Sequence, residues 1–346
     1  MSVHIINPLL DSRWDEFVAW HPQASAFHQR GWLEALSRTY GYQPLALTST
    51  APGKPLTNAV VFCRVSSWVT GTRLVSLPFA DHCQPLVDDS IQLVDFSSWL
   101  CQKCDAQHWR YVEVRPLSNI EVSDHLWRPG RSYYFHDLDI ARSLSQILLS
   151  FHKDSIQRKI QRAEREKLSY HSGQSDDLLR EFYQLLLITR RRHNLCPQPR
   201  LWFKNLVDCM GHDVQIRVVR KDRTPIAAIL TLSHRSSVIY KYGCSDARFH
   251  RCGGMPLLFW RLIEESKARN AEIIDLGRSD LDNPGLVVFK DRFGAAKRRI
   301  TYYRYPQPES ENTFVRSDLR ALRPVLAIIP DAILSMAGRV LYRHIG

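Results

Sequence analysis

The chain has 346 residues, of which 44% are apolar and 24% charged, the composition of a globular protein with one or two domains. With 15 Gly and 18 Pro it is neither fibrous nor broadly disordered, and no apolar run reaches the roughly 18 residues that span a bilayer. The 47 Lys and Arg outnumber the 35 Asp and Glu, giving a formal charge of +12. This charge favours anionic partners such as nucleic acid, phosphate-bearing substrates or the cytoplasmic membrane surface, without choosing among them.

Eight cysteines are present, and the N-terminal residues show no charged stretch followed by an apolar one, so no secretory signal is expected. We therefore predict reduced thiols in a cytoplasmic protein. The C-x-x-C pair, Cys101 and Cys104, lies in a helix-like segment, with no second Cys or His pair at zinc-finger spacing. This favours two ordinary helix cysteines over a metal site, and no metal is predicted.

The first part of the chain mixes helical and strand patterns. Helices are predicted over 13–40 and 91–107, and strands over 44–48, 58–65, 72–77, 109–115 and 133–138. Helical periodicity then covers 141–167 and 176–193 and is broken by the Cys-Pro-Gln-Pro run at 196–199.

The second part repeats a similar order of elements. Strands are predicted over 214–220, 226–233 and 237–243, a helix over 256–269, and strands over 272–276 and 299–305. Two related α/β halves are therefore expected. The predicted divisions are a first domain at 1–140, a helical segment of the second domain at 141–195, the second domain at 196–305, and a separate tail at 306–346.

Three short constellations carry candidate chemistry. Arg251-Cys-Gly-Gly-Met-Pro opens a helix after a strand, where amides and nearby arginines can attract phosphate, although such a sequence is also common in a simple turn. Asp275-Leu-Gly-Arg278 ends a buried strand, so Arg278 and Lys290 can clamp a phosphate or carboxylate; alternatively, Asp275 pairs with a neighbouring base and Arg278 caps a helix. Asp81-His82 can form a base and its orienting partner, or a turn Asp with a surface His.

Two further segments are basic or amphipathic. The helix at 153–167, together with Arg190, Arg191 and Arg192, can bind nucleic acid or anionic lipid, or form a solvated face. In the tail, apolar residues at helical spacing are flanked by arginines, which suits either a helix lying in a membrane interface or a helix packed on the body.

Short motifs also occur in an order typical of one family. They are Leu77-Pro-Phe-Ala-Asp81, Val112-Glu-Val-Arg115, the basic stretch 158–168, Phe182-Tyr183, Thr189-Arg-Arg, Tyr240-Lys-Tyr-Gly-Cys-Ser-Asp246, Met255 to Trp260, Asp275-Leu-Gly-Arg278 and Phe289-Lys-Asp-Arg-Phe-Gly294. On these motifs, residues from about 10 to 305 resemble the FemAB-like branch of the GNAT acyltransferase superfamily, which includes the enzymes that build peptidoglycan bridges. The sequence is especially similar to FemAB-related proteins of exopolysaccharide and exosortase systems.

The resemblance implies an α/β protein with two tandem GNAT-like domains, each a mixed central sheet flanked by helices, plus a helical insertion and an amphipathic tail. It implies transfer of an acyl or aminoacyl group to an amine or hydroxyl. Pro256 departs from the family's acyl-CoA phosphate loop, and the helical arm of tRNA-using members is shortened to 144–193. Acyl-CoA and aminoacyl-tRNA therefore both stand as donors, with no tightly bound cofactor expected.

By position, Asp81, Arg115, Arg278 and Lys290 match motifs of the family. Together with the constellations above, this gives the following predicted roles. Catalytic residues are Asp81 and His82; substrate-binding residues are Arg115, Tyr242, Asp246, Arg278 and Lys290; donor-binding residues are Arg251, Gly253 and Gly254.

The predicted function is an acyltransferase at the cytoplasmic side of the membrane, acting on a phosphate-bearing envelope or exopolysaccharide precursor. Its expected partners are that precursor, tRNA as an alternative donor, and an anionic membrane surface reached through 314–346, but not DNA. The alternative is a non-catalytic basic protein that binds RNA or anionic membrane. Binding to any polyanion with a steep salt dependence, and no acyl transfer, would indicate that alternative.

Overall fold

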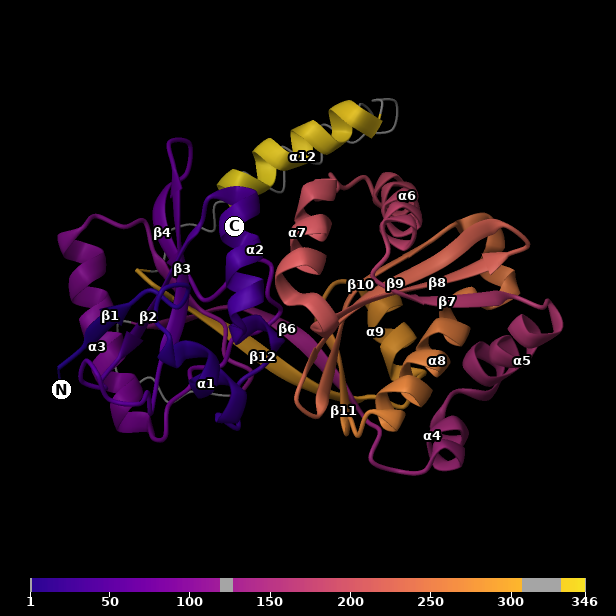
Figure 1. Ribbon diagram of the computed structural model, residues 1–346, viewed down its shortest axis with the longest axis horizontal. Helices are drawn as coiled ribbons and strands as arrows, with labels where there is room; N and C mark the ends of the chain where they lie inside the picture. Colours follow the sequence, from indigo (N-terminus) through magenta and orange to yellow (C-terminus); the bar gives the residue numbers. More distant parts are fainter. Residues whose placement is uncertain (1, 119–126, 307–330, 346) are drawn as a thin grey trace.

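The computed structural model describes residues 2–118, 127–306 and 331–345 (Figure 1). The strands are β1 (His4–Ile6), β2 (Gln43–Thr48), β3 (Val60–Ser67), β4 (Gly71–Val75), β5 (Val112–Val114), β6 (Arg128–Asp139), β7 (Ser169–Gly173), β8 (Val214–Lys221), β9 (Thr224–His234), β10 (Ser237–Ser245), β11 (Ile273–Asp280) and β12 (Ala296–Tyr305). The helices are α1 (Arg13–Trp20), α2 (Arg30–Tyr40), α3 (Ser90–Ala106), α4 (Leu144–Ser150), α5 (Arg158–Arg165), α6 (Asp176–Arg192), α7 (Arg200–Met210), α8 (Gly254–Ala268), α9 (Pro284–Asp291) and α12 (Asp331–Ile345).

All the named strands join one sheet in the order β1-β2-β3-β4-β5-β12-β6-β11-β10-β9-β8-β7. Within it, β4 runs parallel to β5 and β10 runs parallel to β11, whereas the other neighbours are antiparallel. Read inward from either edge, the sheet therefore shows the same pattern: an antiparallel run, one parallel pair and a closing antiparallel strand. This repeated pattern, together with the helices packed on the sheet, confirms the predicted mixed α/β fold.

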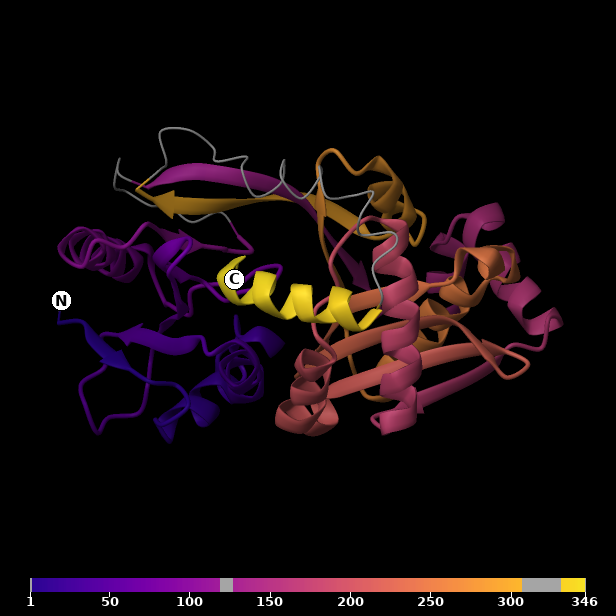
Figure 2. The same cartoon turned by 90° about the horizontal axis from the view of Figure 1, so that it is seen from above.

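Strands β6 and β12 each pair with the half of the sheet that the other part of the chain forms. β6 follows the first half in the sequence but lies between β12 and β11, whereas β12 comes last and pairs with β5 of the first half as well as with β6. Figure 2 shows these two long strands running side by side across the junction. Because each half borrows a strand from the other part of the chain, the junction is held by backbone hydrogen bonds as well as by side chains.

Helix packing also joins the halves. One apolar core runs from α1 and α2 of the first half to α6 and α7 of the second. At its centre the rings of Trp32 and Trp202 lie 5.2 Å apart, and Asn205 donates a hydrogen bond to Thr39. Gly31 permits the close approach of α2 and α7, because a Cβ atom there would lie 2.5 Å from the carbonyl oxygen of Cys209. Separate cores lie under α3 and under α5 and α8.

Several predicted elements are corrected by the structure. The helix predicted over 13–40 is interrupted between α1 and α2, and the one predicted over 141–167 is split into α4, a π-helical turn (Lys153–Gln157) and α5. β1, β7 and α7 were not predicted. The first two are only three and five residues long, and α7 follows the proline-rich break, where periodicity is weak evidence. Cys101 and Cys104 lie on α3, as predicted, and both are buried.

The tail forms α12, which lies across both halves (Figure 1). Its Tyr342 hydroxyl donates to the carbonyl oxygen of Cys196 in the second half, at 2.9 Å. In the first half, Thr70 and Arg73 donate to the carbonyl oxygen of His344. The part of the predicted tail that falls at 307–330 lies outside the described residues. Within the described residues, no helix is long and apolar enough to cross a bilayer.

Candidate active site at the junction of the two halves

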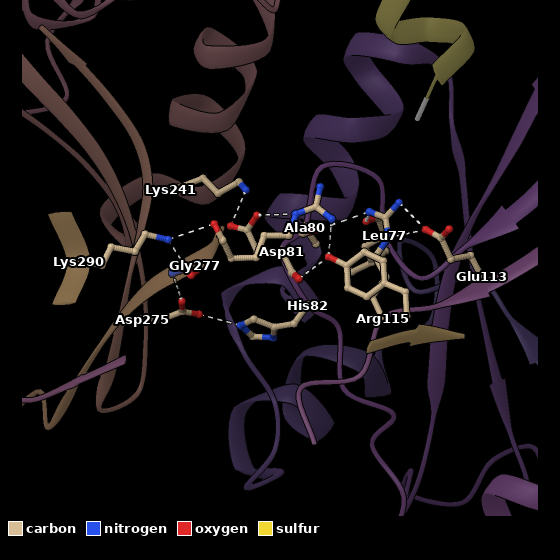
Figure 3. A network of polar contacts seen from close by, with 12 residues as sticks. Leu77, Ala80, Asp81, His82, Glu113, Arg115, Lys241, Asp275, Gly277 and Lys290 are labelled. Atoms are coloured by element: carbon tan, nitrogen blue, oxygen red, sulfur yellow. Dashed lines mark hydrogen bonds and ion pairs between the residues drawn. The ribbon is translucent and has the colours of Figure 1, made fainter. Parts of the chain in front are cut away.

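The loop after β4 brings first-half side chains to the second half (Figure 3). Leu77 and Phe79 adopt left-handed backbone conformations, with φ of 59° and 63°, which are uncommon for residues other than glycine. Arg115 holds this shape, since its guanidinium donates to the carbonyl oxygens of Leu77 and Ala80 at 2.8 and 3.4 Å. Residues held in such backbone conformations cluster at functional sites. The loop directs Asp81 and His82 toward β10 and β11.

Asp81 forms an ion pair with a buried lysine across the junction. Its carboxylate lies 3.0 Å from Nζ of Lys241 on β10 and 3.6 Å from Nε of Arg278 on β11. Burial alone would raise the pKa of Asp81, but the charges of Lys241 and Arg278 outweigh it and lower the pKa below its ordinary value. Asp81 is therefore ionised at neutral pH, so it suits orienting an N–H or O–H group better than accepting its proton.

His82 pairs with Asp275 on β11 and not with Asp81. The distance from Nε2 of His82 to the carboxylate is 2.7 Å, and the other carboxylate oxygen accepts from the amide of Gly277 at 2.6 Å. The expected catalytic pair is thus corrected: Asp81 and His82 are neighbours in sequence but contact different partners. Among the described residues, Nδ1 of His82 has no hydrogen-bond partner. A neutral His82 that donates from Nε2 would leave Nδ1 as an acceptor.

Arg278 is the partly exposed cation of this network. Its side chain is 32% exposed, and its guanidinium carbon lies 4.2 Å from the ring centre of Tyr133 and 5.2 Å from that of Tyr302. It also donates to the Tyr302 hydroxyl at 2.9 Å, and that hydroxyl donates to the carbonyl oxygen of Asp81. The guanidinium is therefore preorganised beside two aromatic rings, with part of its surface open to bind an anionic group.

Lys290 on α9 is buried and its ammonium group is already occupied. Its Nζ donates to the carbonyl oxygens of Gly277 and Arg278, at 2.8 and 3.0 Å. These carbonyls lie at an irregularity of β11, where Gly277 has a φ of 70° and the pairing with β6 shifts register. Lys290 thus supports the strand backbone that carries Arg278, and its part in binding a phosphate stays a prediction.

Lys290 predicts a specific pH dependence of stability. Burial lowers its pKa to about 8 from the ordinary 10.5, although Asp81 and Asp275 favour the charged form. Between pH 8 and 10.5 the unfolded chain binds a proton that the folded chain does not, so the wild-type free energy of unfolding rises with pH there. The gain is about 3 kcal/mol and is absent in Lys290→Met.

Urea denaturation of both proteins at a series of pH values from 7 to 10.5 checks this. The difference in free energy of unfolding, wild type minus variant, should increase across that window, since groups common to both proteins cancel. Parallel stability curves would show that Lys290 keeps its ordinary pKa.

Two of the expected substrate residues have structural partners. Arg115 is paired with Glu113 at 2.8 Å, and Arg304 of β12 contacts the same carboxylate. Burial by itself would raise the pKa of Glu113, but the two arginines lower it to about 2. Asp246 is 4% exposed; it caps the turn after β10 by accepting from the amide of Arg248 and also pairs with that guanidinium.

Tyr242 lies beside the network, within the core. Its hydroxyl accepts from the indole of Trp202 at 2.9 Å, and its ring centre is 5.5 Å from Nζ of Lys241. Burial raises the pKa of Tyr242, which keeps the phenol neutral. Tyr242 is thus placed to shape the surroundings of Lys241.

The predicted donor loop lies apart from this network, beside α5. A Cβ atom on Gly253 would lie 2.2 Å from the carbonyl oxygen of Lys159, and one on Gly254 would lie 3.2 Å from Cβ of Ala227. These glycines therefore allow α8 to begin in close contact with α5 and β9. Arg251 is exposed and lines an open cavity of about 420 Å³. The other residues lining it are Asp154, Arg158, Lys159, Arg162, Arg165 and His250.

Part of the candidate site lies in a region that matches a known protein family. Residues 150–289 match the family model described as an acetyltransferase (GNAT) domain. This part of the chain is a GNAT domain. It includes Lys241, Asp275 and Arg278, whereas Asp81 and His82 come from outside it. A sequence comparison with curated proteins found no significant match.

Solved structures share the fold over most of the chain. FemX is 13% identical, with a TM-score of 0.71 over 88% of this chain and 97% of its own. The C-terminal domain of a proposed lysylphosphatidylglycerol synthetase from Agrobacterium fabrum is 16% identical, with a TM-score of 0.60 over 91% and 96%. A tandem GNAT protein from the clavulanic acid biosynthesis pathway is 10% identical, with a TM-score of 0.53 over 89% and 100%. These likenesses confirm the predicted tandem GNAT fold, and the match to the GNAT family model confirms an acyltransferase.

Sequence reasoning did not assign roles to three members of the network. Lys241 lies inside the quoted Tyr-Lys-Tyr-Gly motif of the GNAT domain, but a lysine in a strand gives no sign of its partner. Tyr133 and Tyr302 lie on the exchanged strands β6 and β12, outside the GNAT domain. Their contacts with Arg278 depend on strand pairing that a sequence pattern does not specify. The one sequence signal for a role of Lys241 was its position between two aromatic residues in a predicted strand.

Proposed function

We propose that this protein transfers an acyl or aminoacyl group to an amine or hydroxyl of a phosphate-bearing cell-envelope or exopolysaccharide precursor, at the cytoplasmic side of the membrane. The observation that carries the proposal is the meeting of Asp81, Lys241 and Arg278 where β10 and β11 separate. These strands pair in parallel only from Ser237 to Ile239; beyond that point β10 continues along β9 and β11 continues along β6. Charged side chains from both parts of the chain meet where these two strands stop pairing, which suits two substrates that must come together.

The acceptor is assigned to the side of Arg278. Its guanidinium would bind a phosphate or carboxylate through two N–H groups, which a planar fork does better than an ammonium. Asp81, ionised and held by Lys241, would accept a hydrogen bond from the acceptor's amine or hydroxyl and so orient its lone pair toward the donor carbonyl. Most of the rate enhancement would then come from proximity and orientation, with Lys241 and Arg278 supplying positive charge near the developing oxyanion.

The donor is assigned to the basic cavity between α5 and the start of α8. Arg158, Arg162 and Arg165 share one face of α5, and Arg251 lines the same cavity. GNAT domains use acyl-CoA as a co-substrate, and its phosphates suit this charge. The phosphates of an aminoacyl-tRNA acceptor stem suit it equally, so the test must separate the two donors.

The fold neighbours support this substrate class. FemX belongs to the FemAB family, and another neighbour carries the name of a lysylphosphatidylglycerol synthetase, which denotes an amino acid joined to a phospholipid. Both names are consistent with acyl or aminoacyl transfer onto envelope components.

Thermal unfolding with separate ligands tests the proposal. The probes are acetyl-CoA, alanyl-tRNA, uncharged tRNA, undecaprenyl phosphate and a uridine-diphosphate-linked muramoyl pentapeptide. A true ligand at about 100 times its Kd adds roughly 2.7 kcal/mol of stability, an easily measured shift in Tm. We expect one donor and one acceptor to shift the Tm, and Arg251→Ala to abolish the donor shift alone.

Arg261→Ala is the matched control, because Arg261 is an exposed arginine on α8 that pairs with Glu264 and does not line the cavity. It should leave both shifts intact. Polyanions that all shift the Tm equally, with no transfer between any donor and acceptor, would refute the proposal in favour of non-specific binding.

A further inference from the structure

The two sides of α12 differ in what they contact. Ser335, Gly338 and Tyr342 fall at helical spacing on the inner side. Ser335 shares a 2.7 Å hydrogen bond with Tyr183, and a Cβ atom on Gly338 would lie 2.0 Å from the carbonyl oxygen of Pro197. The Tyr342 ring packs on Phe79 with centroids 5.6 Å apart. This side therefore fastens the helix to the body, across both halves.

The outer side of α12 places apolar side chains in water. Met336 and Val340, one turn apart, are 64% and 58% exposed, and Arg339 and Arg343 are exposed along the same stripe. A folded domain has little reason to leave such a stripe uncovered after fastening the opposite side so closely. The alternation of apolar and cationic groups is typical of a helix that lies in a membrane interface.

A second exposed apolar element adjoins this stripe. The turn between β3 and β4 presents Trp68, which is 91% exposed, and Val69, which is 60% exposed. The Trp68 ring lies 5.9 Å from that of His344 near the end of α12. In Figure 1 this hairpin and α12 lie along the same edge of the molecule. Tryptophan is the residue most suited to the boundary between lipid headgroups and acyl chains.

We propose that Trp68, Val69, Met336, Arg339, Val340 and Arg343 form a docking face for an anionic lipid bilayer. The apolar members would enter the headgroup region and the two arginines would pair with lipid phosphates. The positive charge of this segment favours an anionic bilayer as its partner. After Asp331, the sequence through Gly346 contains no acidic residue, and the whole chain carries a formal charge of +12. A second copy of the chain would instead bring like-charged arginines against this face.

The helix that carries the docking face also contacts the loop of the candidate active site. Tyr342, on the inner side of α12, packs on Phe79, which precedes Asp81 by two residues in the strained loop. A docked protein would therefore hold that loop close to the bilayer, where a lipid-linked acceptor presents its head group. The benefit of docking for the reaction rests on the proposed function. The evidence for docking itself is the exposure of the apolar side chains and the positive charge beside them.

Vesicle flotation of the full-length protein tests the inference, without any substrate present. Vesicles of phosphatidylcholine with about one third phosphatidylglycerol should bind the protein, and pure phosphatidylcholine should bind it far less. Met336→Ser/Val340→Ser and Trp68→Ala should each weaken binding about tenfold or more. Arg339→Gln/Arg343→Gln should weaken it by a similar factor and remove most of its salt dependence.

Leu149→Ser is the matched control, since Leu149 is a 77% exposed leucine on α4, at the opposite edge of the molecule (Figure 1). It should bind vesicles like the wild type. Absence of wild-type binding, or equal binding by all variants, would overturn the inference. So would a dimer in analytical ultracentrifugation that Met336→Ser/Val340→Ser dissociates, or RNA binding in place of vesicle binding.

Failure of this inference is distinguishable from failure of the proposed function. The thermal shifts with water-soluble donors and with the nucleotide-linked precursor do not involve the docking face. They should be the same in Met336→Ser/Val340→Ser as in the wild type. Vesicle binding without any ligand shift would support docking alone, and ligand shifts without vesicle binding would leave only the transfer activity.

Discussion

Replacing Asp81 with Asn is expected to lower the free energy of unfolding by about 3 kcal/mol, because it leaves a buried ammonium without its counter-ion. Lys241 is only 6% exposed at its side chain and lies 3.0 Å from the carboxylate of Asp81. Asn keeps the size of the side chain but removes its charge and replaces one acceptor oxygen with an NH2 donor. The double variant Asp81→Asn/Lys241→Met removes both charges and should be more stable than Asp81→Asn alone.

Urea denaturation of the two single variants and the double variant measures this coupling. Asp15→Asn is the matched control: Asp15 also lies in an ion pair, 2.7 Å from Arg30, but its side chain is 60% exposed. That change should cost less than about 1 kcal/mol. If Asp81→Asn cost no more than the control, Asp81 and Lys241 would not form a buried pair in solution.

Replacing Arg278 with Ala is expected to weaken binding of the uridine-diphosphate-linked muramoyl pentapeptide about 100-fold, a loss of about 3 kcal/mol. The guanidinium is about one third exposed, so the Tm should fall by only a few degrees. Arg278→Lys should restore little of the affinity, because an ammonium offers neither the planar fork nor the stacking against Tyr133. Isothermal titration calorimetry gives the affinities, and calorimetric unfolding gives the Tm.

Arg298→Ala separates a ligand role from a structural one. Arg298 on β12, which β6 separates from β11, also lies over an aromatic ring, 4.5 Å from the centre of Phe135, and is 44% exposed. Its replacement should leave acceptor affinity unchanged. A large fall in Tm for Arg278→Ala, or equal losses of affinity in both variants, would mark Arg278 as a structural residue.

Local sequence patterns predicted most of the long elements. The strands from β8 to β11 and the helices α3, α6 and α8 follow from periodicity and breakers, because these signals act within one element. β7 and α7 were missed: the former is five residues long and follows a basic helix whose pattern runs into it. The π-helical turn at Lys153–Gln157 also escaped prediction, since an inserted turn leaves the composition helical.

The residues of the candidate site were predicted, but the contacts between them were not. Asp81, His82, Asp275 and Arg278 were all singled out, each with an alternative structural role. The structure brings them together with different partners from those expected: His82 with Asp275, and Asp81 with Lys241. Arg115 and Lys290 hold the backbone that carries Asp81 and Arg278, and their contact with substrate stays a prediction.

By itself, the sequence determined the class of the protein: its charge, its alternation of helices and strands, and the ordered motifs of a GNAT-type transferase. These depend on residues close together in the chain, where spacing reports directly on burial. Only the tertiary structure decided the exchange of β6 and β12, the pairing of Asp81 with a lysine 160 residues away, and which side of α12 faces water. Each of these features joins residues that are distant in the sequence. The packing of the whole chain determines which distant groups meet, and a local sequence pattern does not report on that packing.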